Sequence, residues 1–161
     1  VQTCALPIYT RKDYSVIVAS DEEGKFLVVN QYRQGIKMVT NEFPAGGMES
    51  RDREGAAGPK KEEQALLCAK RELLEETGYT SDKWTHLLTV PSDATMSDNY
   101  AHLFMAENCL KTGEQQLDDM EFVRVIRCTK EEIGQMIETG RFQQAVHMLA
   151  WHLALKAMED G

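Results

Sequence analysis

The chain has 161 residues, of which 42% are hydrophobic and 27% charged, with a net charge of -8. This length and composition indicate one globular domain with a substantial core. The negative charge argues against a nucleic-acid surface, and the lack of any apolar run of about 18 residues argues against a membrane span.

The first eight residues read VQTCALPI, which resembles the translation of a common sequencing adapter. We therefore expect residues 1–8 to be non-native and residues 9–161 to form a single domain. A natural first strand or a processed terminus is the alternative. The segment has no basic region followed by a long apolar core, so it does not read as a secretion signal.

Strands dominate the first part of the chain. The β-branched run at 14–19 predicts a strand, and the turn-forming residues 21–24 follow it. Residues 25–31 are expected to form its hairpin partner. A further short strand is expected at 39–43, ending at Pro44.

The second half mixes strands with helices, and no repeat is visible. This alternation predicts an α/β (α+β) sandwich built on a mixed sheet. The expected elements after residue 83 are strands at 84–90, 100–106 and 121–128, a helix from Thr129 to Gly140, and a last helix at 142–158. The apolar face of that last helix is expected at Ala145, Met148, Leu149, His152 and Leu155.

A longer helix is expected between these halves, from about Pro59 to Glu76. Proline is tolerated at a first helical position, and Gly78 can supply a left-handed C-cap. Its buried stripe is expected at Leu66, Leu67, Leu73 and Leu74.

Three carboxylates lie within five residues near the end of this helix. Glu72 and Glu76 stack one turn apart on one face, and Glu75 lies beside them. Arg71 can pair with Glu75 at i, i+4, which frees Glu72 and Glu76 for a divalent cation. Oxygen ligands favour Mg2+ or Mn2+ over zinc. A solvated acidic helix end is the alternative interpretation.

The four cysteines show no C-x-x-C spacing and no suggestive partner histidines. We expect buried free thiols in a reducing compartment, without disulfides or zinc, and hence a cytoplasmic protein. They are Cys4, Cys68, Cys109 and Cys128.

The string R-E-L-L-E-E-T-G-Y at 71–79 resembles the second half of the Nudix box, G-x5-E-x7-R-E-U-x-E-E-x-G-U, in which U is apolar. Counting back eight positions from Arg71 gives Glu63, where the box has its first glutamate. Six positions before Glu63 lies Ala57 instead of glycine. On this spacing Glu63 approaches the site only from its edge, and a surface charge in the first helical turn is the alternative.

The turn that normally opens the box, here Pro44-Ala45-Gly46, lies 17 positions before Glu63 instead of 6. We therefore expect an insertion of about eleven residues within about 47–61. Its Gly, Ser, Arg, Asp and Glu content predicts an exposed loop.

Within the Nudix hydrolases, the sequence is similar to ADP-ribose pyrophosphatase-like nucleoside diphosphate-sugar hydrolases. The similarity lies in G-K-F-L-V-V-N-Q-Y-R-Q-G at 24–35, N-E-F-P-A-G at 41–46 and D-D-M-E-F-V-R-V-I at 118–126. The resemblance implies an α/β/α sandwich with a loop-helix-loop box. It also implies metal-dependent hydrolysis of a nucleoside diphosphate sugar, ADP-ribose foremost, to AMP and ribose 5-phosphate, by a homodimer.

The resemblance assigns roles to the site residues. Glu72 and Glu76 are expected to bind Mg2+ or Mn2+, with the Ala45 carbonyl as a third ligand and Glu75 as a ligand or support. Arg71 orients this group. In the resembled enzymes the general base comes from a loop outside the box, and the candidates are Glu121, Asp119, Asp118 and Asp98, in that order.

Three residues near the second strand are candidates for substrate binding. Arg33 carries a guanidinium fork that suits pyrophosphate oxygens, although a surface ion pair is an equal alternative. Glu42 is expected either to hydrogen-bond the substrate or to hold the adjacent turn. Tyr32 can stack on a base, although packing is the simpler interpretation.

Two other functions remain open from the sequence. The same chemistry could act on GDP-mannose, NADH or FAD. A non-catalytic Nudix-fold binding module is the alternative from a different class. Such modules usually lose box glutamates, whereas Glu72, Glu75 and Glu76 are all present.

Overall fold

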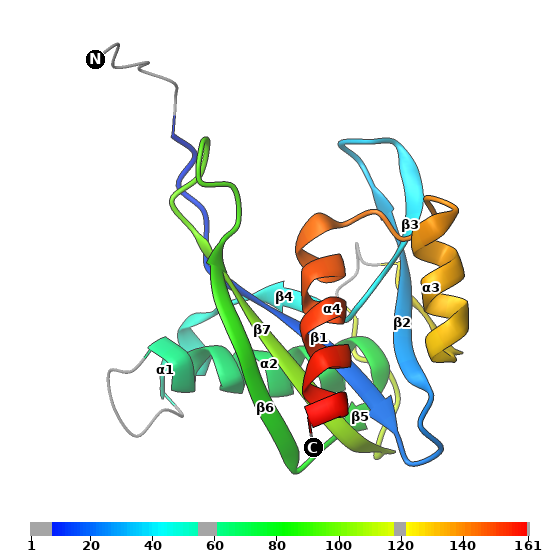
Figure 1. Ribbon diagram of the computed structural model, residues 1–161. Coiled ribbons are helices and arrows are strands. Elements are labelled where there is room, and N and C mark those ends of the chain that lie inside the picture. The colour runs from blue at the N-terminus through cyan, green and yellow to red at the C-terminus, as the bar shows by residue number, and fades with distance from the viewer. Residues whose placement is uncertain (1–7, 55–60, 118–121, 161) are drawn as a thin grey trace.

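A computed structural model describes residues 8–54, 61–117 and 122–160 (Figure 1). The strands are β1 (Tyr14–Asp21), β2 (Phe26–Arg33), β3 (Met38–Glu42), β4 (Ala45–Gly47), β5 (Tyr79–Thr80), β6 (Lys83–Pro91), β7 (Tyr100–Lys111) and β8 (Arg124–Cys128). The helices are α1 (Ser50–Glu54), α2 (Lys61–Thr77), α3 (Lys130–Glu138) and α4 (Ala145–Asp160). The mixed sheet follows the order β3-β2-β1-β7-β5, and β4, β6 and β8 pair with β1, β7 and β2.

Strand β1 lies at the centre and is buried on both faces. It pairs in parallel with β7, from Tyr14↔Ala101 to Ala19↔Ala106. Successive side chains alternate, so that Val16 and Val18 face one core while Ile17 faces the other. Helix α4 covers the first face and α2 the second (Figure 1). The predicted sandwich with a mixed sheet is therefore confirmed.

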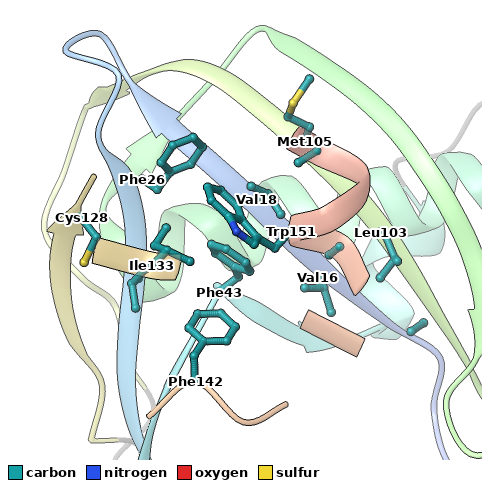
Figure 2. Close-up of a cluster of buried hydrophobic side chains, with 14 residues drawn as sticks. Val16, Val18, Phe26, Phe43, Leu103, Met105, Cys128, Ile133, Phe142 and Trp151 are labelled. Carbon is teal, nitrogen blue, oxygen red and sulfur yellow. The ribbon is translucent and has the colours of Figure 1, made fainter. Parts of the chain in front are cut away.

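Aromatic rings fill the core beneath α4 (Figure 2). The Trp151 ring meets Phe26 edge-on at 4.8 Å between centroids, and it lies 5.8 Å from Phe43. Phe142 packs on the other side of Phe43, at 5.0 Å. Phe43 directly precedes Pro44, so this core fixes the turn that opens the box.

The opposite core is formed by α2 and uses small side chains. Ala65, Ala69 and Leu73 pack with Ile17 and Phe104. The expected stripe of four leucines is confirmed at Leu73 and in part at Leu66, which packs partly buried against this core, whereas Leu67 and Leu74 are only half-buried. Alanine at two contact positions lets the helix backbone approach the sheet closely.

Helix α4 starts later than predicted, and its predicted apolar face is confirmed only in part. It begins at Ala145, not at residue 142, because Phe142 turns inward against Phe43. Its buried residues are His147, Ala150, Trp151 and Ala154, whereas His152 is exposed. Of the predicted apolar face, Met148, Leu149 and Leu155 pack partly buried against the same core.

Strands β1 and β2 form the predicted hairpin only at its closed end. Their pairing is antiparallel at Ser20↔Phe26, after which β1 follows β7 while β2 pairs with β3 and β8. The Asp21 carboxylate accepts from the amides of Glu23 and Lys25 at 2.9 Å each. Gly24 has a φ of 73°, which explains glycine in this turn.

Three elements were not predicted, namely α1, β4 and β5. Helix α1 falls within 47–61, where an exposed loop was expected, and residues 55–60 lie outside the described residues. No described helix is long and apolar enough to span a bilayer. Cys68, Cys109 and Cys128 are buried free thiols, as predicted, while Cys4 lies outside the described residues.

His147 on α4 is hydrogen-bonded to the chain next to the box turn. The Phe43 amide donates to His147 Nδ1 at 3.1 Å, so this nitrogen carries no proton. Burial lowers the pKa of His147 to about 4, from 6.5, although the nearby Glu42 charge opposes the shift. The imidazole is therefore neutral at physiological pH.

This buried histidine makes the fold acid-sensitive. Between pH 6.5 and 4, His147 is protonated in the unfolded chain but remains neutral in the folded chain. The unfolding free energy therefore falls as the pH falls. We expect His147 to account for about 2–3 kcal/mol of the unfolding free energy lost between pH 7.5 and 4.5. Urea unfolding at the two pH values measures the loss.

The variant His147→Asn keeps an acceptor for the Phe43 amide but does not titrate. It should lose less unfolding free energy on acidification than the wild type. The exposed His152 on the same helix provides the control, and His152→Asn should match the wild type. Equal acid sensitivity of all three proteins would exclude His147 as the cause.

Candidate functional site

Helix α2 brings two of the predicted carboxylates to the turn at Pro44–Gly46. The Ala45 amide donates to Glu76 Oε2 at 3.0 Å. A Cβ added at Gly46 would overlap the Glu72 carboxylate, so this side chain lies directly over the glycine. Glu72 and Glu76 thus meet at the turn, as their i, i+4 spacing predicted.

Arg71 connects three elements at this site. Its Nε donates to Asp52 Oδ1 of α1 at 2.9 Å, and its Nη2 donates to the Gly47 carbonyl of β4 at 2.9 Å. Its Nη1 donates to Glu72 at 2.6 Å and to Glu75 at 2.8 Å. The predicted pair with Glu75 is therefore confirmed. The expectation that this pair leaves Glu72 without an arginine contact is wrong, because one nitrogen serves both carboxylates.

The charges at Arg71 shift the pKa values of its neighbours. Burial alone would lower the pKa of Arg71, but the hydrogen bonds and charges of Asp52, Glu72 and Glu75 raise it above its usual value. Burial likewise opposes ionisation of Asp52, yet the Arg71 hydrogen bonds hold its pKa below the usual range. Arg71 is thus a permanent cation that neutralises part of a dense acidic group.

Beside this group, Cys68 remains a thiol. Burial, reinforced by the negative charge of Glu72, raises the pKa of Cys68 to about 12. Its sulfur donates to the Gly46 carbonyl at 3.3 Å. Cys68 therefore packs α2 against the turn and offers no thiolate for chemistry.

Asp52 is the site residue that the sequence reasoning missed. Counting forward six positions from Gly46, as in G-x5-E, gives Asp52, whereas counting back from Arg71 gave Glu63. The Asp52 side chain is 3% exposed and bound to Arg71, while Glu63 is exposed in the first turn of α2. Asp52 therefore fills the position of the first box glutamate, and the extra residues follow it.

This assignment predicts different effects for the two acids. Asp52→Ala leaves Arg71 buried with fewer partners, and breaking such a pair costs about 3 kcal/mol. Glu63→Ala removes an exposed charge and should change the unfolding free energy by less than about 0.5 kcal/mol. Urea denaturation of both variants compares them directly, and a larger loss from Glu63→Ala would contradict the assignment.

Arg33 and Glu42 form an ion pair instead of two separate substrate contacts. Arg33 Nε donates to Glu42 Oε1 at 2.8 Å, and its Nη2 donates to Oε2. The Glu42 carboxylate is fully buried and also accepts from Thr40 and Gln144. In this structure Glu42 therefore holds Arg33 and has no surface open to solvent.

The ion pair lies within electrostatic reach of the box. The hydrogen bonds that Arg33 donates to Glu42 raise the pKa of Arg33 above its usual value, and the negative charge of Glu76 on α2 raises it further. Burial opposes ionisation of Glu42, but the Arg33 bonds keep its pKa below the usual range. Arg33 itself is 36% exposed, so its outer edge faces solvent.

The remaining candidates are Tyr32, for substrate binding, and four loop acids, for the general base. Tyr32 is 51% exposed on β2, so about half of its surface is open to solvent. Asp118, Asp119 and Glu121 lie outside the described residues. Asp98 lies in the β6–β7 loop, which extends away from α2 (Figure 1), and accepts from the Arg11 amide at 3.0 Å.

The C-terminal end of α2 is joined to the segment after β7. Gly78 has a φ of 75°, which confirms the predicted left-handed cap, and a Cβ there would overlap the Gly113 carbonyl. The Gln116 amide donates to the Glu75 carbonyl at 2.8 Å, and Gln115 Nε2 donates to the Glu76 carbonyl at 2.6 Å. The chain that leads to residue 118 therefore starts at the end of the carboxylate-bearing helix.

The donor set at the turn fits a hard divalent cation. Glu72 and Glu76 supply carboxylate oxygens at the turn, and glycine at position 46 leaves room for Glu72. Within the described ranges, no three acidic, histidine or cysteine side chains already converge as a metal cluster. Arg71 Nη1 instead bridges Glu72 and Glu75, so that these two carboxylates share one cation.

Known proteins resemble this chain in sequence and in fold. A family model described as NUDIX domain matches residues 10–151. The chain is 33% identical over 130 residues to an ADP-ribose pyrophosphatase of Bacillus subtilis, covering 80% of this chain and 64% of that protein. It is 29% identical over 150 residues to a methanol dehydrogenase activator of Bacillus methanolicus, covering 92% of this chain and 75% of that protein.

A solved structure of an ADP compounds hydrolase has the same fold. The TM-score is 0.74 at 18% identity, over 92% of this chain and 73% of that chain. At this identity the likeness concerns the fold alone. The present chain spans less than two thirds of the length of the Bacillus subtilis relative.

Proposed function

This chain belongs to the Nudix family, and from that membership we propose that it is a divalent-metal-dependent pyrophosphohydrolase. Its proposed substrate is a nucleoside diphosphate sugar, most directly ADP-ribose, which water converts to AMP and ribose 5-phosphate. The Bacillus subtilis relative, named an ADP-ribose pyrophosphatase, supports this substrate.

One observation carries the proposal. Glu72 and Glu76 come from one face of α2 and meet the backbone at Ala45 and Gly46. Carboxylates held against a turn by a buried arginine offer oxygen ligands at one place, which Mg2+ or Mn2+ requires. An ordinary solvated helix end would have no reason to bury Glu76 or to bind Arg71 in this way.

The residues then take the following roles. Glu72, Glu76 and the Ala45 carbonyl would hold Mg2+ or Mn2+, with Glu75 as a further ligand. The ion would supply positive charge that offsets the negative charge of the diphosphate. Glu42 holds Arg33 so that its exposed edge meets the diphosphate.

A carboxylate from Glu121, Asp119 or Asp118 takes the proton of the attacking water. The water oxygen forms a new bond to one phosphorus as the bridging P–O bond breaks. The leaving phosphate carries the bridging oxygen away.

A substrate panel tests the proposal. ADP-ribose, GDP-mannose, NADH and FAD are each incubated with Mg2+, with Mn2+ and with a chelator, and products are identified by mass. Metal-dependent release of AMP and ribose 5-phosphate, fastest for ADP-ribose, is the expected result. Faster cleavage of another compound would keep the chemistry and change the substrate, while no cleavage of any would leave the binding-module alternative.

We further propose that the protein is a homodimer that acts in the cytoplasm. Buried free thiols at Cys68, Cys109 and Cys128 suit a reducing compartment. Light scattering coupled to gel filtration tests the assembly. A mass of one chain at assay concentration would contradict the dimer.

A further inference from the structure

Arg51 is a second arginine at the carboxylate group, contributed by α1. Its Nη2 lies 3.1 Å from Glu75 Oε1, while Arg71 Nη1 holds Glu75 Oε2 at 2.8 Å. Each oxygen of Glu75 is therefore paired with a different guanidinium. A metal ion that approached Oε1 would therefore compete with Arg51 for that oxygen.

The two arginines differ in how firmly they are held. Arg71 is 13% exposed and is fixed by Asp52, by the Gly47 carbonyl and by two glutamates. Arg51 is 56% exposed, and its ion pairs are with Glu75 and with Glu49, which is 42% exposed. Exposed ion pairs of this kind contribute little stability, so a divalent cation readily displaces one.

After displacement from Glu75, the Arg51 guanidinium could bind phosphate oxygens of the substrate. It lies on the short helix that follows β4, and its own side chain is more than half exposed where it meets Glu75. A substrate diphosphate bound beside the carboxylates would offer phosphate oxygens, which a guanidinium fork binds in two-pronged fashion. Arg33 is on β2, so the two arginines would approach the diphosphate from different elements.

Resting on the proposed function, we propose that Arg51 is a displaceable counter-cation. It pairs with Glu75 before the metal binds, yields Glu75 to the metal, and then contacts the diphosphate. Arg51 thus competes with the metal and assists the substrate. A residue that merely supported the site would instead weaken metal binding when removed.

Binding of Mn2+ to the substrate-free full chain tests the first step, by calorimetry or by the EPR signal of free Mn2+. In Arg51→Ala the dissociation constant for Mn2+ should fall about two- to five-fold, because a competing ion pair of up to about 1 kcal/mol is gone. Lys70→Ala is the matched control. It removes one positive charge from an exposed position next to Arg71 and should leave Mn2+ affinity as in the wild type.

Unchanged or weaker Mn2+ binding in Arg51→Ala would overturn the inference. Equal tightening in Lys70→Ala would also overturn it, because net charge alone would then explain the effect. Failure of the wild type to bind Mn2+ at all would instead count against the proposed function. The two failures are therefore distinguishable.

Steady-state kinetics on ADP-ribose at saturating Mn2+ test the second step. Arg51→Ala should raise KM about five- to ten-fold, as expected for loss of a phosphate contact, while Lys70→Ala should not. A KM equal to that of the wild type would refute the diphosphate contact. The inference therefore predicts that Arg51→Ala binds Mn2+ more tightly and the substrate more weakly than the wild type.

Discussion

Glu72→Gln should lower kcat about a hundred- to thousand-fold on whichever substrate the wild type cleaves. The substitution keeps the size of the side chain and removes the negative charge that a divalent ion needs. Glu72 lies over Gly46 and is bound to Arg71, so the amide would remain in the same place. Initial rates over a range of Mg2+ and Mn2+ concentrations measure the loss.

The same helix supplies the control for this experiment. Glu62→Gln removes a carboxylate from the exposed first turn of α2 and should leave kcat unchanged. Circular dichroism and the urea midpoint confirm that both variants remain folded. If Glu72→Gln retains wild-type turnover, catalysis does not depend on this carboxylate and the enzyme interpretation loses its basis.

Gly46→Ala should reduce activity about a hundred-fold while changing stability by about 1 kcal/mol or less. The new methyl group would overlap the Glu72 carboxylate and push it off the turn. That carboxylate is the far end of a flexible side chain, so it can move at small cost to the fold. Gly46 does not have a positive φ, so alanine fits its backbone.

Gly47→Ala is the neighbouring control. A Cβ at Gly47 would meet only Lys12 Cδ at 4.0 Å, which is ordinary van der Waals contact. Kinetics and urea unfolding of both alanine variants should show a site defect at position 46 and almost none at 47. Equal activity of the two would show that the position of Glu72 over the turn is unimportant.

The sequence predicted the layers of this fold better than the faces of its helices. Continuous apolar runs such as 14–19 indicate strands buried on both sides, and the structure has them there. Helix α4 is apolar on several faces, so spacing alone could not distinguish the face of Trp151 from that of His152. Which face packs depends on Phe26 and Phe43, which are distant in sequence.

The candidate site was predictable where it depends on local spacing. Glu72, Glu75 and Glu76 lie within one turn of helix, so their proximity follows from helical geometry. Asp52 lies six positions after Gly46, the spacing of the first box glutamate, but the extra residues between Asp52 and Arg71 move it out of register with the rest of the box. The Arg71–Asp52 contact is a tertiary one across 19 positions.

The sequence pattern did not predict the ion pairs that join residues of different elements. Glu42 alternates correctly for a strand residue, yet nothing local reveals that its carboxylate is buried and satisfied by Arg33, Thr40 and Gln144. Burial of an acid depends on whether partners arrive from elsewhere in the chain. For the same reason, the sequence does not predict the contact between Arg51 and Glu75, because it depends on how α1 packs against α2.

The bonds of Arg71 link the short helix α1 to the carboxylates at the turn. Five residues cannot maintain a helix in water by themselves, and α1 depends on Asp52 being held by that guanidinium. Fraying of Ser50–Glu54 would loosen Glu72 and Glu75 while the central sheet remained intact. On heating, we expect activity to be lost at a lower temperature than the sheet unfolds, because the smallest helix of the site is also its least self-supporting element.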